Sequence, residues 1–157
     1  MPSKAGPPKV TTPSPKTDTK PSARFASTRA AHRDETAEDY VEAIAHLIDH
    51  TGTARVGALA TYMGVSHVTV TRIINRLNRQ GLVTKEPRKP IHLTPTGQTM
   101  AQQSQARHQI ILDFLLALGI EESQAQIDAE GIEHHTSQQT LGALAELTRT
   151  LKNTKKP

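Results

Sequence analysis

The segment 130–135, with the sequence EGIEHH, concentrates metal-ligating side chains in six residues. On a helix, residues i, i+3 and i+4 share one face, so Glu130, Glu133 and His134 are predicted to point the same way. The two carboxylates repel each other, and no Lys or Arg occurs from residue 109 to 147 to neutralise them. A divalent cation that accepts oxygen and imidazole ligands, such as Mn²⁺ or Fe²⁺, is the simplest neutraliser. For this cluster alone, a solvated polar helix face is the alternative interpretation.

The composition limits what kind of protein this is. A chain of 157 residues has room for one ordinary domain or two small ones that share a core. It has no Cys, which excludes disulfides and thiolate metal sites and agrees with a reducing cytosol. No apolar run approaches the roughly 18 residues that span a bilayer, and no signal-peptide core precedes the first domain. We therefore expect a soluble, cytoplasmic protein with no membrane partner.

The formal net charge of +4 is unevenly distributed. Residues 1–33 carry seven Lys and Arg against one acid, residues 55–98 again carry seven against one, and the remainder is acidic. Basic segments attract polyanions, most often nucleic acid, whereas the acidic half is where a cation would bind. Residues 1–33 are also rich in Pro, Ser and Thr, which predicts a flexible basic tail.

Apolar periodicity and turn residues predict five elements in the first half of the chain: helices at about 35–50, 56–62 and 67–80, and short strands at 82–85 and 91–93. A helix, a turn, a second helix and a basic hairpin, in that order, are typical of a winged helix-turn-helix. We assign this DNA-binding domain to residues 34–98.

The second half is predicted to be entirely helical. Thr94-Pro95 is a strong helix start, and this helix should run to about Leu118, followed by helices at about 121–134 and 137–151. Residues 110–118 are apolar almost all round, more than a chain this small can easily bury, so we expect a homodimer interface there. The expected fold is mainly α, with a winged helix-turn-helix followed by a metal-binding dimerisation domain over residues 99–157.

The pattern from Gly64 to Val83 is fairly specific for DNA binding, although winged helices sometimes contact proteins instead. Residues near the start of a recognition helix reach base edges in the major groove. Val68 is placed to meet a thymine methyl group and Arg72 to pair with guanine. The candidate phosphate contacts are Ser66, Thr69, Thr71 and Arg76, with Lys85, Arg88 and Lys89 on the wing. Each wing charge, taken singly, is equally well a solvated surface residue.

Three segments together resemble the diphtheria toxin repressor (iron-dependent repressor) family, and within it the manganese-responsive branch. They are 37–42 (AEDYVE), Arg107-His108 and 129–135 (AEGIEHH), in the family's order, and the resemblance covers residues 35–150. It implies a metal-activated winged-helix repressor whose metal ligands fall on Asp39, Glu42, His108, Glu130, Glu133 and His134. Longer members have a C-terminal SH3-like domain, which we do not expect in this chain.

The charge of this ligand set favours two cations. Four carboxylates and two neutral imidazoles carry −4, which two divalent ions would cancel, and the resemblance also implies a binuclear site with a bridging Glu. Iron-responsive relatives have sulfur ligands where this chain has Asp39 and Glu130, which favours two Mn(II) per subunit, with Fe(II) possible. We expect Mn(II)-activated binding to double-stranded operator DNA and repression of manganese uptake genes. The alternative is an iron-responsive or metal-independent winged-helix regulator.

An enzyme is the rival class, and the motifs argue against it. Glu133-His134 is similar to the end of the His-x-x-Glu-His zinc-protease motif, but Glu130 occupies the place of its first His. Ferritin-like di-iron sites need Glu-x-x-His pairs on two helices, which this chain does not provide. We therefore expect no catalytic activity. Instead, carboxylate repulsion should let the winged domains move relative to the dimer core until metal joins them.

Overall fold

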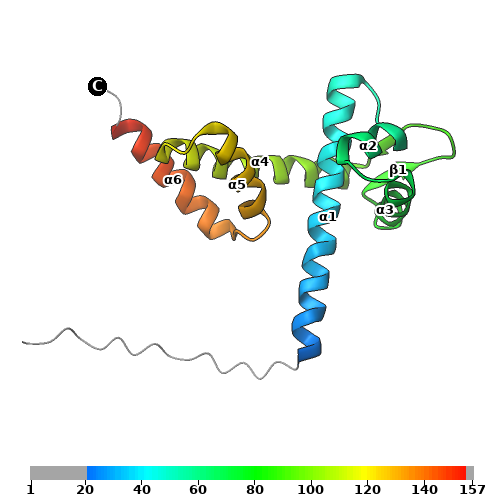
Figure 1. Cartoon of the computed structure of the whole chain (residues 1–157), viewed down its shortest axis with the longest axis horizontal. Coiled ribbons are helices and arrows are strands. Elements are labelled where there is room, and N and C mark those ends of the chain that lie inside the picture. Colours follow the sequence, from blue (N-terminus) through cyan, green and yellow to red (C-terminus); the bar gives the residue numbers. More distant parts are fainter. Residues whose placement is uncertain (1–20, 155–157) are drawn as a thin grey trace, which may run out of the picture.

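The computed structural model describes residues 21–154, with side chains described at residue 32 and from residue 34 onward. In this part the elements are α1 (Pro21–Thr51), α2 (Val56–Met63), α3 (His67–Arg79), β1 (Val83–Lys85), β2 (Ile91–Leu93), α4 (Pro95–Leu118), α5 (Glu122–Glu133) and α6 (Gln138–Thr154) (Figure 1). The mainly helical fold and the order of its elements agree with the prediction. None of these helices is both long enough and apolar enough to cross a membrane.

Helix α1 begins at Pro21 rather than near residue 35. The prediction of a flexible tail is therefore wrong for residues 21–33, whereas residues 1–20 of that tail lie outside the described residues. The reason is local. Proline is well tolerated at the first position of a helix, and the following segment, SARFASTRAA, is rich in alanine, the best helix former.

The winged helix-turn-helix unit packs around the second half of α1. Tyr40, Val41, Ile44 and Leu47 form the predicted apolar stripe, and all four are buried in one core with residues of α2, α3 and the hairpin. The two strands pair antiparallel, with Val83 opposite Leu93. Burial of the α1 stripe fixes α1 against the helix-turn-helix, so its acidic side faces the rest of the molecule.

A single residue, Thr94, connects this unit to α4. Its hydroxyl lies 2.6 Å from the Gly81 carbonyl oxygen and accepts from the Gly97 N–H at 3.1 Å, capping α4. Gly97 sits so close to the hairpin that a Cβ there would lie 2.0 Å from the Leu82 carbonyl oxygen. Ala101, one turn further on, is buried in the core of the winged unit. The start of α4 is therefore fastened to the DNA-binding unit.

The far end of α4 forms a second core with α5 and α6. Ile111, Leu112, Ala125, Ala129 and Leu141 are buried together there. In Figure 1, α4 crosses α1 and carries this helical unit away from the winged unit.

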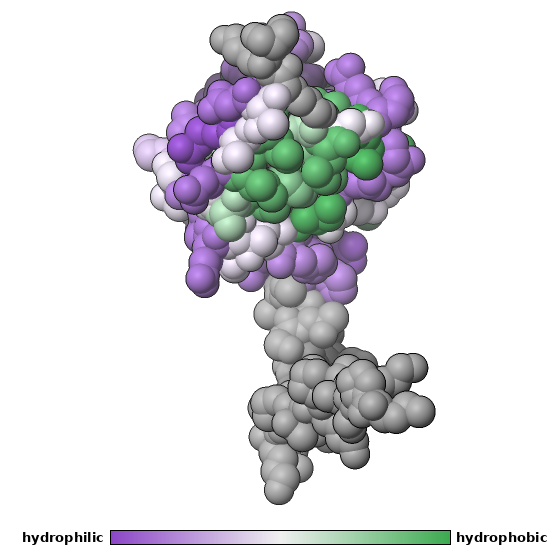
Figure 2. Space-filling view, turned by 90° about the vertical axis from the view of Figure 1, so that its left-hand side faces the viewer, coloured by the Kyte–Doolittle hydropathy of each residue, from purple (hydrophilic) through white to green (hydrophobic). Residues whose placement is uncertain are grey.

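This helical unit has a hydrophobic outer face. Figure 2 shows an apolar patch on the end of the molecule built by α4–α6. Most of the exposed large hydrophobic side chains belong to this part of the chain: Leu116, Leu118, Ile120, Ile127, Ile132 and Leu147. Contiguous apolar surface of this kind is typical of an interaction site, although Ile111 and Leu112 of the apolar half of α4 are buried in the core of the helical unit itself.

Candidate metal centre and nucleic-acid interface

Six side chains predicted as ligands converge where three helices meet. α1 contributes Asp39 and Glu42, α4 contributes His108, and α5 with its C-terminal cap contributes Glu130, Glu133 and His134. Helical spacing explains the arrangement, since Asp39 and Glu42 are three residues apart and lie beside the buried stripe of α1. The site therefore draws on the winged unit and on the helical unit together.

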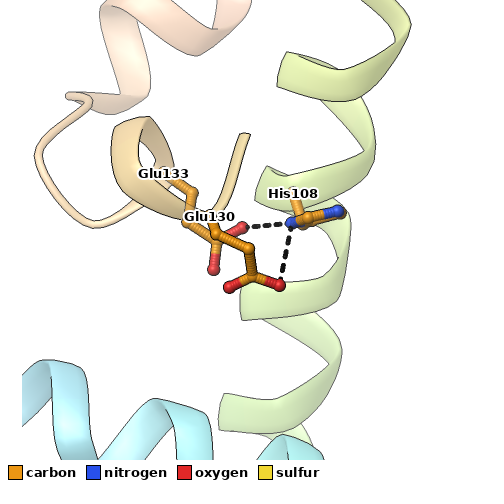
Figure 3. Close-up of side chains that lie close together, drawn as sticks. All are labelled: His108, Glu130 and Glu133. Atoms are coloured by element: carbon orange, nitrogen blue, oxygen red, sulfur yellow. Dashed lines mark hydrogen bonds and ion pairs between the residues drawn. The ribbon is translucent and has the colours of Figure 1, made fainter. Parts of the chain in front are cut away.

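His108, Glu130 and Glu133 form the tightest group (Figure 3). The Nδ1 atom of His108 lies 2.9 Å from Oε2 of Glu133 and 3.8 Å from Oε1 of Glu130. One potential ligand atom from each residue lies within 4.8 Å of the others. The helical spacing predicted for Glu130 and Glu133 is present, and His108 approaches them from α4.

His134 connects this group to α1. Its Nε2 atom lies 3.4 Å from Oδ1 of Asp39 and 3.5 Å from Oε1 of Glu133. Glu42 lines the same open cleft of about 650 Å³ as Asp39, Glu130 and His134. Solvent ions can reach the carboxylates through that cleft.

The carboxylates of the site are held in an unfavourable environment. Glu133 is only 1% exposed. Burial raises its pKa to about 7, with the His108 imidazole opposing the shift and the nearby Glu42 charge adding to it. Burial also raises the pKa of Asp39 and of Glu42 above their usual range. Carboxylates whose ionisation is made costly by burial gain most from a neighbouring cation.

The donor set fits a divalent cation. Carboxylate oxygens and imidazole nitrogens converge with no sulfur among them, a combination suited to hard and borderline metals. A hydrogen bond between His108 and Glu133 requires one proton between them, and a metal ion can replace that proton. The cluster is therefore more than a solvated polar face.

Two residues next to predicted ligands were missed. Arg107 donates from Nη2 to Oε2 of Glu38 at 2.6 Å, and the same oxygen lies 3.2 Å from Nδ1 of His134. The stretch without Lys or Arg begins after His108, and Arg107 lies one position before that histidine. A sequence signal was present, because Glu38 and Arg107 each immediately precede a predicted ligand on a helix.

The predicted reading surface on α3 is open to solvent. Val68 is 79% exposed, and Arg72 is exposed one turn later. The Ser66 hydroxyl caps α3 by accepting from the Thr69 N–H at 3.1 Å. The other predicted DNA contacts are half-buried at Thr71, Arg76 and Lys85 and exposed at Arg88 and Lys89.

Family models match almost all of the described chain. Residues 34–91 match the N-terminal DNA-binding domain of iron-dependent repressors, and residues 94–156 match their metal-binding and dimerisation domain. The chain is 45% identical over 125 residues to the transcriptional regulator MntR of Salmonella typhimurium, covering 80% of each chain. It is 32% identical over 114 residues to the HTH-type transcriptional regulator MntR of Lysinibacillus sphaericus, covering 73% of this chain and 82% of that one.

Solved structures have the same architecture. A manganese-dependent transcriptional repressor in complex with manganese has a TM-score of 0.64 at 27% identity over 71% of this chain. The IdeR of T. acidophilum has a TM-score of 0.61 at 27% identity over 69% of this chain. The chain spans about half the length of either, 52% in both cases.

Proposed function

Because the chain belongs to the iron-dependent repressor family, whose members are transcriptional regulators and not enzymes, we propose that it is a manganese-responsive regulator that binds operator DNA. The single observation that supports this most strongly is the placement of the acidic site. Asp39 and Glu42 belong to α1 of the winged unit, whereas Glu130 and Glu133 belong to α5 of the helical unit. Occupancy of the site can therefore influence how the two units are held.

We propose Asp39, Glu42, His108, Glu130, Glu133 and His134 as the ligands of Mn(II), two ions per subunit, with Fe(II) as a possible substitute. When bound, the cations supply the positive charge that offsets repulsion among these carboxylates. The absence of sulfur from the set favours Mn(II) over later metals. The chain's own residues do the rest, since α1 then stays against α4 and α5 instead of being pushed away.

The DNA-binding residues carry the second part of the proposal. α3 enters the major groove, where Val68 contacts a thymine methyl group and Arg72 pairs with guanine. Ser66, Thr69, Thr71, Arg76, Lys85, Arg88 and Lys89 contact phosphates, although the Ser66 and Thr69 hydroxyls also serve the cap of α3. Bases and phosphates are then read by different side chains of one unit, residues 34–98.

A homodimer places two such units on one operator. The apolar face of α4–α6, within residues 99–157, is the proposed interface, and two recognition helices about one DNA turn apart read a palindromic site. In the cytoplasm, the manganese-loaded dimer bound to its operator represses genes for manganese uptake. An iron-responsive or metal-independent regulator is the alternative function.

A binding experiment with three metal conditions separates these functions. Operator DNA is first selected from a random duplex pool with the full chain and Mn²⁺, and its affinity is then measured by fluorescence anisotropy with Mn²⁺, with anaerobic Fe²⁺, or with chelator. We expect Mn²⁺ to tighten binding by more than about tenfold, the usual scale of allosteric coupling. Stimulation by Fe²⁺ alone would support the iron-responsive alternative. Equal binding in chelator would reject metal control.

A further inference from the structure

The two ring nitrogens of His134 face different partners. Nε2 faces Asp39 at 3.4 Å and Glu133 at 3.5 Å, both proposed metal ligands. Nδ1 faces Oε2 of Glu38 at 3.2 Å, and Glu38 is outside the proposed ligand set. The ring itself is largely enclosed, with 12% of its side chain exposed. The contact with Glu38, on the side of the ring away from the carboxylate cluster, thus determines the orientation of the ring.

We propose that Glu38, held in place by Arg107, is a positioning residue that fixes the ring orientation and tautomer of His134 for metal binding. The inference rests on the proposed metal-responsive function. An ionised carboxylate only accepts hydrogen bonds, so in this contact Nδ1 of His134 carries the proton. In a neutral imidazole the lone pair then lies on Nε2, the atom that faces Asp39 and Glu133. Ligating histidines generally donate their other N–H to such a partner.

Arg107 keeps Glu38 out of the ligand set. Its guanidinium donates to Oε2 of Glu38 at 2.6 Å, and both side chains are mostly buried, at 16% and 22% exposed. The arginine charge balances the Glu38 charge, so Glu38 adds no net negative charge to the site. Because one oxygen of Glu38 receives both Arg107 and His134, the arginine sets where that oxygen lies and hence where the ring lies.

The chain uses the same arrangement for its other imidazole. His108 faces Glu133 with Nδ1 and the side-chain oxygen of Gln126 with Nε2, at 2.9 and 3.2 Å. Each imidazole of the site therefore has one nitrogen toward the carboxylates and one toward an acceptor that is not a proposed ligand. His134 differs because its acceptor comes from α1, the helix of the winged unit. Glu38 thus connects the ring of the helical unit to the DNA-binding unit.

The test compares Glu38→Ala with Glu35→Ala. Glu35 lies one turn earlier on α1, and its Oε1 is 3.7 Å from Nε2 of His135, a histidine outside the ligand set. Calorimetric titration of the full chain with Mn²⁺ should show about 10–100-fold weaker binding for Glu38→Ala, the usual cost of losing such a partner. Glu35→Ala, which removes an equal charge, should stay within about threefold of wild type. A thermal transition for each variant establishes that it folds.

Two further measurements distinguish positioning from a general electrostatic role. In the metal-free protein, ¹⁵N shifts of the His134 ring should report a proton on Nδ1 for wild type and a mixture of tautomers for Glu38→Ala. In the His134→Ala background, Glu38→Ala should cause no additional loss of Mn²⁺ affinity, because its effect passes through His134. Glu38→Gln retains an acceptor and should recover part of the affinity.

The failures of the two proposals are distinguishable. If wild type binds no Mn²⁺, or binds it without any effect on operator affinity, the proposed function fails. If wild type is manganese-responsive but Glu38→Ala binds Mn²⁺ normally with an unchanged His134 tautomer, only the positioning role is rejected. Additive losses in the double variant would also overturn it, since Glu38 would then act independently of His134.

Discussion

At the scale of single residues, a change at Asp39 is predicted to separate metal binding from metal response. Asp39 lies 3.4 Å from Nε2 of His134 and belongs to α1 of the winged unit, whereas Glu130, Glu133 and His134 belong to the helical unit. We expect Asp39→Ala to remain dimeric and retain some Mn²⁺, yet lose most of the metal-stimulated operator affinity, by about tenfold or more. Calorimetry and anisotropy measure the two properties separately. Asp34→Ala, an exposed acid on the same helix, is the control. Normal stimulation of Asp39→Ala would refute the junction mechanism.

The raised pKa of Glu133 predicts that the stability of the metal-free fold falls as the pH rises. Its pKa is raised to about 7 by burial, so between its ordinary value and about pH 7 the folded chain holds a proton that the unfolded chain has released. Above about pH 7 the folded chain must bury the charge. The metal-free protein should therefore lose stability as pH rises from about 5 to about 8.

Thermal midpoints measured in chelator check this sign. Glu133→Gln cannot ionise there and should show a flatter pH dependence than wild type over the same range. Saturating Mn²⁺ should weaken or reverse the wild-type trend, because metal ligation requires the deprotonated carboxylate. A metal-free midpoint that increases with pH in wild type, and equally in Glu133→Gln, would contradict the assignment.

At the scale of the elements, α3 should govern sequence discrimination without affecting the metal. Arg72 is exposed on the predicted recognition helix α3, which is not one of the three helices that carry the proposed metal ligands. Arg72→Ala should keep wild-type Mn²⁺ binding and lose about 1–3 kcal/mol of discrimination between the selected operator and a single-base variant. Arg79→Ala, near the other end of α3, is the matched control. If Arg72→Ala discriminates as well as wild type, the prediction that Arg72 recognises guanine is wrong.

Substitution of Gly97, with Gly142 as a control, tests how closely the start of α4 packs against the hairpin. Gly97→Ala places a methyl group 2.0 Å from the Leu82 carbonyl oxygen, so the backbone must shift. We expect a loss of about 1–3 kcal/mol in the free energy of unfolding, the usual cost of overpacking. Gly142→Ala, in α6 with open space around it, should instead stabilise by about 0.5–1 kcal/mol. Chemical denaturation of both variants gives the comparison, and equal effects would show that the joint is loose.

The elements were largely predictable because their signals are local. The Thr94 cap with Pro95 predicted the start of α4, and the helix ends at Leu118 as expected. The start of α1 was not predicted because residues 21–33 share their Ser, Thr and basic residues with the proline-rich segment before them. The Glu38–Arg107 pair joins residues 69 positions apart, and only the crossing of α1 and α4 brings them together. Periodicity within one helix contains no information on such a pair.

At the scale of the whole molecule, the apolar face of α4–α6 predicts the oligomeric state. Leu118 is 53% exposed at the end of α4, so replacing it leaves the monomer core intact. Leu118→Asp should shift the dimer toward monomer, while Tyr62→Asp, an exposed position on α2, should not. Light scattering at micromolar concentration decides this, with a thermal transition as the folding control. A wild-type protein that is already monomeric would reject the interface.

One contact between the two units does not involve a proposed metal ligand. Arg107 of α4 pairs with Glu38 of α1. The metal would then be one of two links across this junction. The coupling free energy between metal binding and DNA binding should therefore be a few kcal/mol. We do not expect metal to switch the junction from fully disordered to fully ordered.

The first turns of α4 also decide where related regulators can be recombined. Consider a chimera of two related regulators whose break lies between the hairpin and α4. Thr94 and Ala101 then come from one parent, whereas the carbonyl oxygen and the core side chains that they contact come from the other. A crossover beyond His108 keeps both of these contacts, and the Arg107–Glu38 pair, within one parent. Chimeras that exchange DNA specificity should therefore fold when the break falls after residue 108 of α4 and aggregate when it falls near residue 94. The segment that must be exchanged as a whole to transfer operator recognition is therefore longer than the winged domain itself.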